Sequence, residues 1–239
     1  MLGMESALGP TAQGEGAWVA ALLARGFAVV APGNCWGDLW HGRGDNPYEE
    51  RYLRYGAYLM SEAIGVASRR SHISAETLLV LGLGEGGRGV TELVLDGVQI
   101  DGVVVDSSPD WLSPWVAQPT LHQPELEALF AIYDADLDGA TEPTVKLNAL
   151  RVALERDSLV HAVQDLGFRA PIVYAWSSLD ERIDPALSQP AADTIQVNYP
   201  PVNQAVLDWA VPDHAPSNRD PAQATERLDW LLGRLGLLE

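Results

Sequence analysis

Two polar residues far apart in the sequence, Asp180 and His214, carry a carboxylate and an imidazole, the two groups that a catalytic triad combines with a hydroxyl. In such a triad the histidine accepts the proton of a nucleophilic hydroxyl, and a buried carboxylate holds the imidazole in the useful tautomer. Asp180 follows the apolar run 171–176, and His214 follows the largely apolar run 205–209. Both residues therefore stand in loops directly after segments with strand character.

The third member of a triad, the nucleophile, is missing: the chain has no hydroxyl at the position where it is expected. Residues 77–87, TLLVLGLGEGG, indicate a buried strand, a glycine-framed sharp bend and the start of a helix. This is the setting of the G-x-S-x-G nucleophile elbow, where small residues allow a strained turn that lifts one hydroxyl above the sheet. Gly84 occupies the serine position and supplies no nucleophile. The backbone N–H of Glu85 would still help to stabilise an oxyanion.

Helices and strands alternate around these residues. The pattern predicts helices at 16–25, 48–68, 85–95 and 222–235, and strands at 27–32, 77–82, 102–106, 171–176 and 205–209. Such alternation predicts an α/β fold with a mostly parallel sheet flanked by helices. We expect a single domain over 1–239, with the largely helical segment 109–169 as an insertion that covers the strand ends.

The order of these motifs resembles the α/β-hydrolase fold superfamily, in particular its serine esterases and lipases. Residues 20–32 are similar to a helix and strand of that family, 77–87 to its elbow, 177–185 to its acid-bearing loop and 211–215 to its histidine loop. The resemblance implies a three-layer sandwich and a carboxylic ester or amide hydrolase, with Asp180 as orienter and His214 as general base. Asp184 and Asp106 are alternative orienters. Only residues 1–15 precede the first expected helix, so we expect the family's N-terminal strands to be reduced here; a natural minimal fold, a truncation and a misread start site would all give this pattern.

Three explanations of Gly84 remain open. The serine was lost naturally and the domain is a non-catalytic binding module, or a serine was replaced deliberately, or His214 activates water without an elbow nucleophile. Retention of Asp180 and His214 favours the second explanation or a recent loss. We therefore expect a hydrolase-like protein that is inactive as it stands.

A calcium loop is the one candidate metal site in the sequence. Asp134, Asp136 and Asp138, followed by Gly139, resemble the first half of an EF-hand after the helical run 125–133. Carboxylates at loop positions one, three and five converge on a hard cation. The twelfth position holds valine rather than glutamate, and an acidic helix end explains the pattern equally well. We expect no required cofactor, with calcium as the candidate ion that pins the insertion.

A dinucleotide-binding turn is a further alternative. Gly82, Gly84 and Gly87 fit G-x-G-x-x-G after a strand, and Asp106 ends the next strand. That fingerprint usually opens its domain, whereas here a strand and two helices come first. It also leaves Asp180 and His214 unexplained, so a nucleotide-dependent oxidoreductase ranks below the hydrolase.

Composition restricts the partners. The formal net charge of −18 disfavours nucleic acid and anionic membrane surfaces. The resemblance to the hydrolases implies a small ester-like molecule as substrate or ligand. Trp36 and Trp111 fall in loops near expected strand ends and are candidates for lining its pocket, although core filling explains them equally well. No stretch reaches the ~20 apolar residues of a membrane span. The first residues lack a signal-peptide pattern, so we expect a cytoplasmic protein or a mature secreted form.

Overall fold

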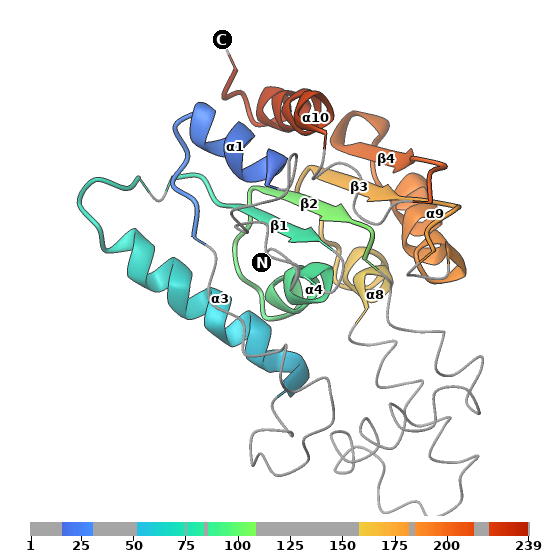
Figure 1. The fold of residues 1–239 in the computed structure, drawn as a ribbon. Coiled ribbons are helices and arrows are strands. Elements are labelled where there is room, and N and C mark those ends of the chain that lie inside the picture. Colours follow the sequence, from blue (N-terminus) through green and yellow to red (C-terminus); the bar gives the residue numbers. More distant parts are fainter. Residues whose placement is uncertain are drawn as a thin grey trace, which may run out of the picture.

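A four-stranded parallel sheet forms the centre of the protein. The computed structural model describes residues 16–30, 52–74, 76–83, 86–108, 158–181, 185–212 and 220–238 (Figure 1). The strands lie side by side in chain order, and each pairs in parallel with the next. Their bounds are β1 Leu79–Leu83, β2 Gly102–Asp106, β3 Ile172–Trp176 and β4 Gln204–Asp208. Because all four strands run in one direction, their carboxyl ends share one edge of the sheet.

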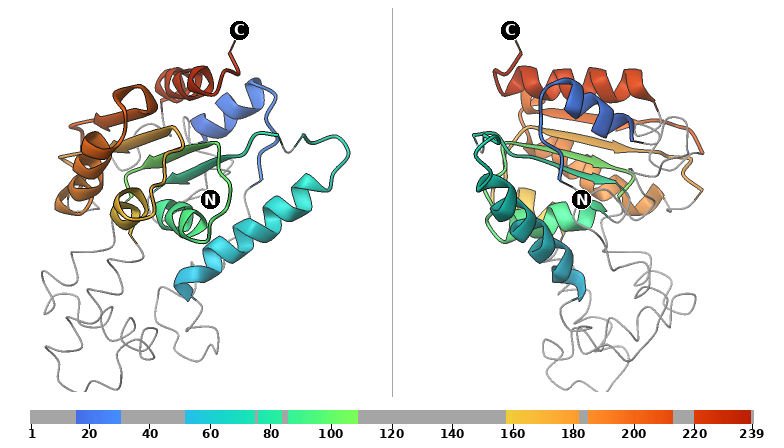
Figure 2. Two further views of the ribbon diagram at one scale, coloured as in Figure 1. Left: turned by 180° about the vertical axis from the view of Figure 1, so that it is seen from behind. Right: turned by 60° about the vertical axis from the view of Figure 1, so that its left-hand side comes forward.

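Helices cover both faces of this sheet, as expected for a three-layer sandwich. Figures 1 and 2 show α1 and α10 on one face and α3, α4, α8 and α9 on the other. The helix bounds are α1 Ala17–Ala24, α3 Tyr52–Ser68, α4 Gly86–Leu95, α8 Leu159–Gln164, α9 Gln189–Asn198 and α10 Pro221–Arg234, with short 3₁₀ turns η3 Pro185–Leu187 and η4 Pro201–Asn203. None of the helices in the described ranges is both long and apolar enough to cross a membrane.

The central strands bury alternate residues in two separate apolar clusters. Val103 and Val105 of β2 belong to the cluster beneath α4, α8 and α9. Val104 of β2 and Val173 of β3 belong to the cluster beneath α1 and α10. Successive side chains of a strand point to opposite faces, so a sheet covered on both faces needs continuous apolar runs. This is why the segment GVVVD is buried at every position.

The predicted α/β fold class is confirmed, and most predicted elements are present. β2 has the predicted bounds, and β1, β3 and β4 begin and end close to the predicted positions. α1 stops before Gly26, whose φ of 81° is the left-handed conformation that ends many helices. Residues 1–15 and 109–157 lie outside the described residues, so the reduced N-terminal strands and most of the insertion stay predictions. α8 belongs to the last part of the predicted insertion and packs on α9 and α4.

Residues 27–30 differ from the prediction. The apolar run 27–32 predicts a strand covered on both faces, whereas 27–30 form no strand, and Ala28 and Val30 are exposed. These residues border a groove of about 820 Å³ beside the amino-terminal half of β1, which Met60 of α3 also lines. An apolar run indicates that a segment tends to be buried, but it does not indicate whether a neighbouring strand pairs with that segment.

Candidate functional site

The corner between β1 and α4 is built from glycines in close contact. β1 ends at Leu83 and α4 begins at Gly86, so the chain passes from strand to helix through two residues. A Cβ atom added at Gly82 would lie 2.6 Å from the carbonyl oxygen of Gly86 and from the backbone N and Cα of Gly87. Side chains do not tolerate such proximity to backbone atoms, so glycine is required for this approach. The strand and the helix predicted within 77–87 are therefore present and approach each other closely, while Gly84 and Glu85 between them lie outside the described residues.

The corner after β2 lies beside the first one. Asp106 is completely buried and is paired in register with the last residue of β1. The hydroxyl of Ser107 donates to Asp106 Oδ1 at 3.0 Å, and Ser107 has a φ of 51°, a left-handed conformation that is rare outside glycine. The carbonyl of Ser108 accepts hydrogen bonds from the hydroxyls of Tyr174 at 3.2 Å and Ser188 at 3.1 Å. This corner is thereby fastened to β3 and to the start of α9.

Asp180 lies in the loop after β3, at the same edge of the sheet. It is buried, with 9% of its surface exposed, and its N–H donates to the carbonyl of Ser177 at 3.3 Å. The N–H of the next residue, Glu181, donates to the carbonyl of Pro212 at 3.3 Å. The loop that carries Asp180 is therefore hydrogen-bonded to the segment that leads, two residues further along the sequence, to His214.

The buried hydroxyl of Ser177 joins the same two loops. It accepts the N–H of Val211 at 3.0 Å and the N–H of Leu179 at 3.2 Å, and it donates to the carbonyl of Val211. A hydroxyl has one proton to donate and two lone pairs to accept with, so all of its capacity is used here. Ser177 was not among the predicted site residues, although its place directly after a buried strand was an available signal.

Asp208, the last residue of β4, bonds in turn to the loop after β3. Its Oδ1 accepts the N–H groups of Ser178 and Ala210, both at 2.9 Å. Burial alone would raise the pKa of the Asp208 carboxyl. Hydrogen bonds from these two N–H groups and from the Ser178 side chain outweigh burial and hold the pKa below its ordinary value. Ala210 has a φ of 48°, so the chain turns sharply after β4.

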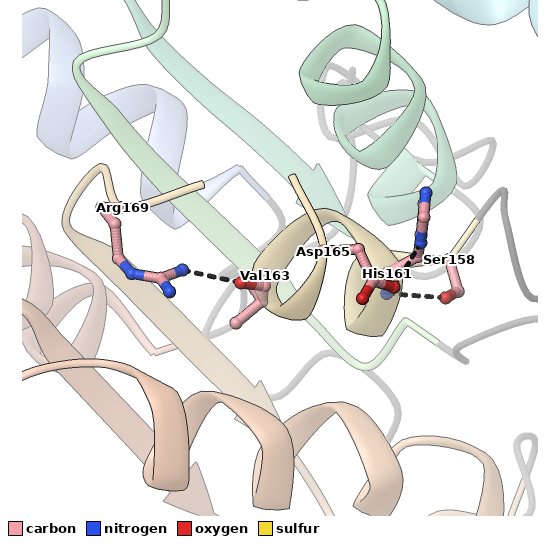
Figure 3. A network of polar contacts seen from close by, with 5 residues as sticks. All are labelled: Ser158, His161, Val163, Asp165 and Arg169. Atoms are coloured by element: carbon pink, nitrogen blue, oxygen red, sulfur yellow. Dashed lines mark hydrogen bonds and ion pairs between the residues drawn. The ribbon is translucent and has the colours of Figure 1, made fainter. Parts of the chain in front are cut away.

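A histidine–aspartate pair lies on α8 and its C-cap and has a structural explanation. Nδ1 of His161 is 2.6 Å from Oδ2 of Asp165 one turn later, and the two side chains are 27% and 64% exposed (Figure 3). The N–H of His161 donates to Ser158 Oγ at 3.0 Å, which caps the helix. Arg169 closes the other end by donating to the carbonyl of Val163 at 2.7 Å. An exposed pair at this spacing stabilises a helix by a fraction of a kcal/mol, about 0.3 to 0.5.

Among the predicted site residues, Asp180 belongs to the described part of the chain, and so does the alternative orienter Asp106. The other candidates lie outside the described residues: Gly84, Glu85, His214, Trp36, Trp111, Asp134, Asp136, Asp138 and Asp184. Their roles stay predictions. Within the described ranges, no three His, Cys, Asp or Glu side chains cluster in a way that could hold a metal ion. The groove beside β1 lies along the amino-terminal half of that strand, away from the edge where Asp106 and Asp180 lie.

Comparisons with known proteins identify similar structures but no related sequence. No family model matches the chain, and no curated protein matches it. Two structures of the esterase Pf2001 from Pyrococcus furiosus match with TM-scores of 0.55 and 0.54, at 15% and 13% identity. These matches cover 92% of this chain and 74% and 76% of the esterase. TT1662 from Thermus thermophilus matches with a TM-score of 0.49 and 17% identity, over 80% of this chain and 69% of that protein.

The fold is therefore α/β-hydrolase-like, similar to that of the esterase Pf2001. The likeness to Pf2001 agrees with the four parallel strands in chain order and with helices on both faces. Strand order and the shared carboxyl edge bring together the β1 corner, Asp106 and the loop of Asp180. In open sheets of this kind, ligands bind outside the carboxyl ends of the strands. We take this edge as the candidate functional site.

Proposed function

We propose that this chain is an α/β-hydrolase-fold protein with the site of a serine carboxylic ester hydrolase, in which Gly84 replaces the nucleophile. It is inactive towards esters as it stands. The observation that carries the proposal is the hydrogen bond from Glu181 N–H to Pro212 O. That bond ties the loop of Asp180 to the segment leading to His214, at the edge where β1 turns into α4.

Each residue has a definite role in this proposal. Asp180 accepts a hydrogen bond from the His214 imidazole and fixes its tautomer, and the imidazole serves as general base. The N–H of Glu85, close to the amino end of α4, donates to the oxyanion that forms at the acyl carbon. Position 84 lacks the hydroxyl that would attack that carbon. The close approach of Gly82 to Gly86 and Gly87 supports a corner tight enough to present a side chain at position 84.

The proposed ligand is a small ester-like molecule. Trp36 and Trp111 are the proposed apolar walls of its pocket, and the net charge of −18 disfavours polyanionic ligands such as nucleic acids. An uncharged or cationic acyl compound fits this surface best.

The substitution Gly84→Ser tests the proposal. We expect the variant to hydrolyse short p-nitrophenyl esters at a rate at least about 100-fold above that of the unaltered chain, since a serine restores the missing nucleophile. Adding His214→Ala should return the rate to the background of the unaltered chain. Initial rates of p-nitrophenol release, measured at several ester concentrations, give kcat and KM for both variants.

A non-catalytic binding module on the same fold is the second candidate. The glycine at position 84 favours it, because the chain has no hydroxyl where the elbow needs one. If Gly84→Ser folds normally and releases no p-nitrophenol above background, the binding module becomes the better explanation. A serine variant whose activity persists without His214 would also exclude the proposed triad.

A further inference from the structure

Two loops at the candidate site are fastened to each other by side chains from both of them. The loop after β3 contributes Ser177, whose hydroxyl bonds to the N–H and carbonyl of Val211 in the loop after β4. The loop after β4 follows Asp208, whose carboxylate accepts the N–H of Ser178 in the loop after β3. Each loop therefore holds the backbone of the other.

Backbone contacts complete the connection. Trp209 N–H donates to the carbonyl of Trp176 at 2.9 Å, which extends the β3–β4 ladder past the ends of the strands. The left-handed turn at Ala210 is closed by its own N–H bond to Asp208 Oδ1 at 2.9 Å. At the far end, Glu181 N–H reaches the carbonyl of Pro212. We call the pair Ser177 and Asp208, with these contacts, the loop latch.

Asp180 lies between the two loop-latch residues in the sequence. The last contact of the loop latch, at Pro212, comes two residues before His214. Ser177 lies three residues before Asp180 and accepts the N–H of Leu179 between them. Ser177 is 2% exposed, so its hydroxyl makes these bonds away from competing water. Asp208 is more exposed, and its two N–H partners compensate by favouring the charged carboxylate.

We infer that Ser177 and Asp208 are positioning residues for the proposed site. They fix the backbone around Asp180 against the backbone that leads to His214, so that the carboxylate and the imidazole meet in one geometry. In this proposal they act through Asp180 and His214 rather than on the ester itself. This inference rests on the proposed function, because it assigns the loop latch a role in orienting the proposed general base. A misplacement of about 1 Å in such a group can cost about 100-fold in rate.

The first experiment reads the histidine directly and needs no turnover. An imidazole N–H held by a carboxylate gives a far-downfield proton resonance that is protected from exchange with water. We expect one such resonance in the unaltered chain, assigned by its loss in His214→Ala and Asp180→Ala. It should be lost or broadened in Ser177→Ala and in Asp208→Ala. Asp208→Asn retains an oxygen that can accept both N–H groups, so it should keep the resonance.

A matched control lies at the opposite edge of the sheet. Asp101 Oδ2 accepts the N–H of Leu78 at 2.7 Å, which is also a carboxylate-to-backbone bond beside a strand. Asp101→Ala should lower stability to a similar extent and leave the His214 resonance unchanged. A resonance that survives both alanine variants of the loop latch, or that Asp101→Ala removes as well, overturns the inference. So does the lack of any such resonance in the unaltered chain.

The second experiment places the same variants in the Gly84→Ser protein. Ser177→Ala and Asp208→Ala should lower kcat at least about tenfold, with KM changed less than about twofold, because orientation of the base matters after the ester has bound. Asp101→Ala should change neither constant. If Gly84→Ser is inactive while the latch-dependent resonance is present, the proposed function fails and the positioning role stands. If Gly84→Ser is active and neither Ser177→Ala nor Asp208→Ala changes its kcat, the positioning role is refuted and the proposed function is retained.

Discussion

The corner after β1 and the paired corners after β3 and β4 are held together in opposite ways. At the β1 corner, Gly82 touches the backbone of Gly86 and Gly87, and the absence of side chains permits the contact. At the β3–β4 corners, Ser177 and Asp208 bridge the two loops with side-chain hydrogen bonds. The β1 corner depends on the lack of a side chain at Gly82, whereas the β3–β4 corners depend on the polar side chains of Ser177 and Asp208.

This difference determines how each corner should respond to substitution. A corner made by close backbone approach has no room to adjust, so any added atom must push the strand or the helix. A corner made by hydrogen bonds to a loop can lose one bond and admit water in its place, at a cost of about 1 kcal/mol. We therefore expect the β1 corner to be the more sensitive to substitution, and the β3–β4 corners to be the more tunable.

The largest effect is expected from Gly82→Ala. The new methyl group would lie 2.6 Å from three backbone atoms of Gly86 and Gly87, so we expect a loss of about 3 kcal/mol in the free energy of unfolding. Urea denaturation followed by tryptophan fluorescence measures this loss as a lower midpoint. Gly65→Ala in α3 is the matched control, because an alanine there meets no backbone atom nearby and should stabilise the helix by about 0.5 to 1 kcal/mol. Equal effects of the two changes would refute the close contact.

A smaller effect of opposite sign is expected from Ala210→Gly. Ala210 has a φ of 48°, where a side chain costs about 1 to 2 kcal/mol and glycine costs nothing. Glycine also has more backbone freedom in the unfolded chain, which offsets part of this benefit. We therefore expect the free energy of unfolding to rise by about 0.5 to 1 kcal/mol. The same denaturation experiment measures it. A loss of stability would mean that the left-handed turn is absent in solution.

The smallest effect is the acid dependence of Asp208. The folded protein lowers the pKa of this carboxyl, so its contribution to stability is complete above the unfolded pKa, about 3.9, and disappears as the pH falls through the folded value. At pH 7 we expect the free energy of unfolding of the unaltered chain to exceed that of Asp208→Asn by about 0.5 kcal/mol. This value is small because the carboxylate is largely exposed to solvent. That advantage should shrink below about pH 4. Denaturation of both proteins at pH 3, 5 and 7 measures the trend, and a constant difference would contradict it.

The sequence predicted the elements whose signals are local. β2 is recognisable because its run of valines must be buried on both faces, and α10 begins and ends one residue before the predicted bounds 222–235. The structure adds its cap: Asp220 Oδ1 accepts the N–H groups of Ala222 at 2.9 Å and Gln223 at 3.2 Å.

Elements and contacts that depend on tertiary structure were not predictable in this way. Helix α9 was missed altogether: Ser188 stands at its N-cap position, but its hydroxyl donates to the carbonyl of Ser108, 80 positions away in the chain. The loop latch was missed for the same reason, because Ser177 and Val211 meet only after β3 and β4 have paired. Asp180 was predicted because residues 177–185 resemble the acid-bearing loop of the α/β hydrolases, and the structure adds its burial and the loop connection beside it.

The layer formed by α1 and α10 has a consequence for synthesis of the protein on the ribosome. Trp18 of α1 is 1% exposed and shares an apolar cluster with Leu228 and Leu231 of α10, and Arg25 is paired with Asp229 at 2.5 Å (Figure 1). About two hundred residues are translated between these two helices, which takes roughly 10 to 40 seconds. During that interval the apolar surface of α1 has no α10 to cover it. The nascent chain therefore carries this surface without that cover until α10 emerges.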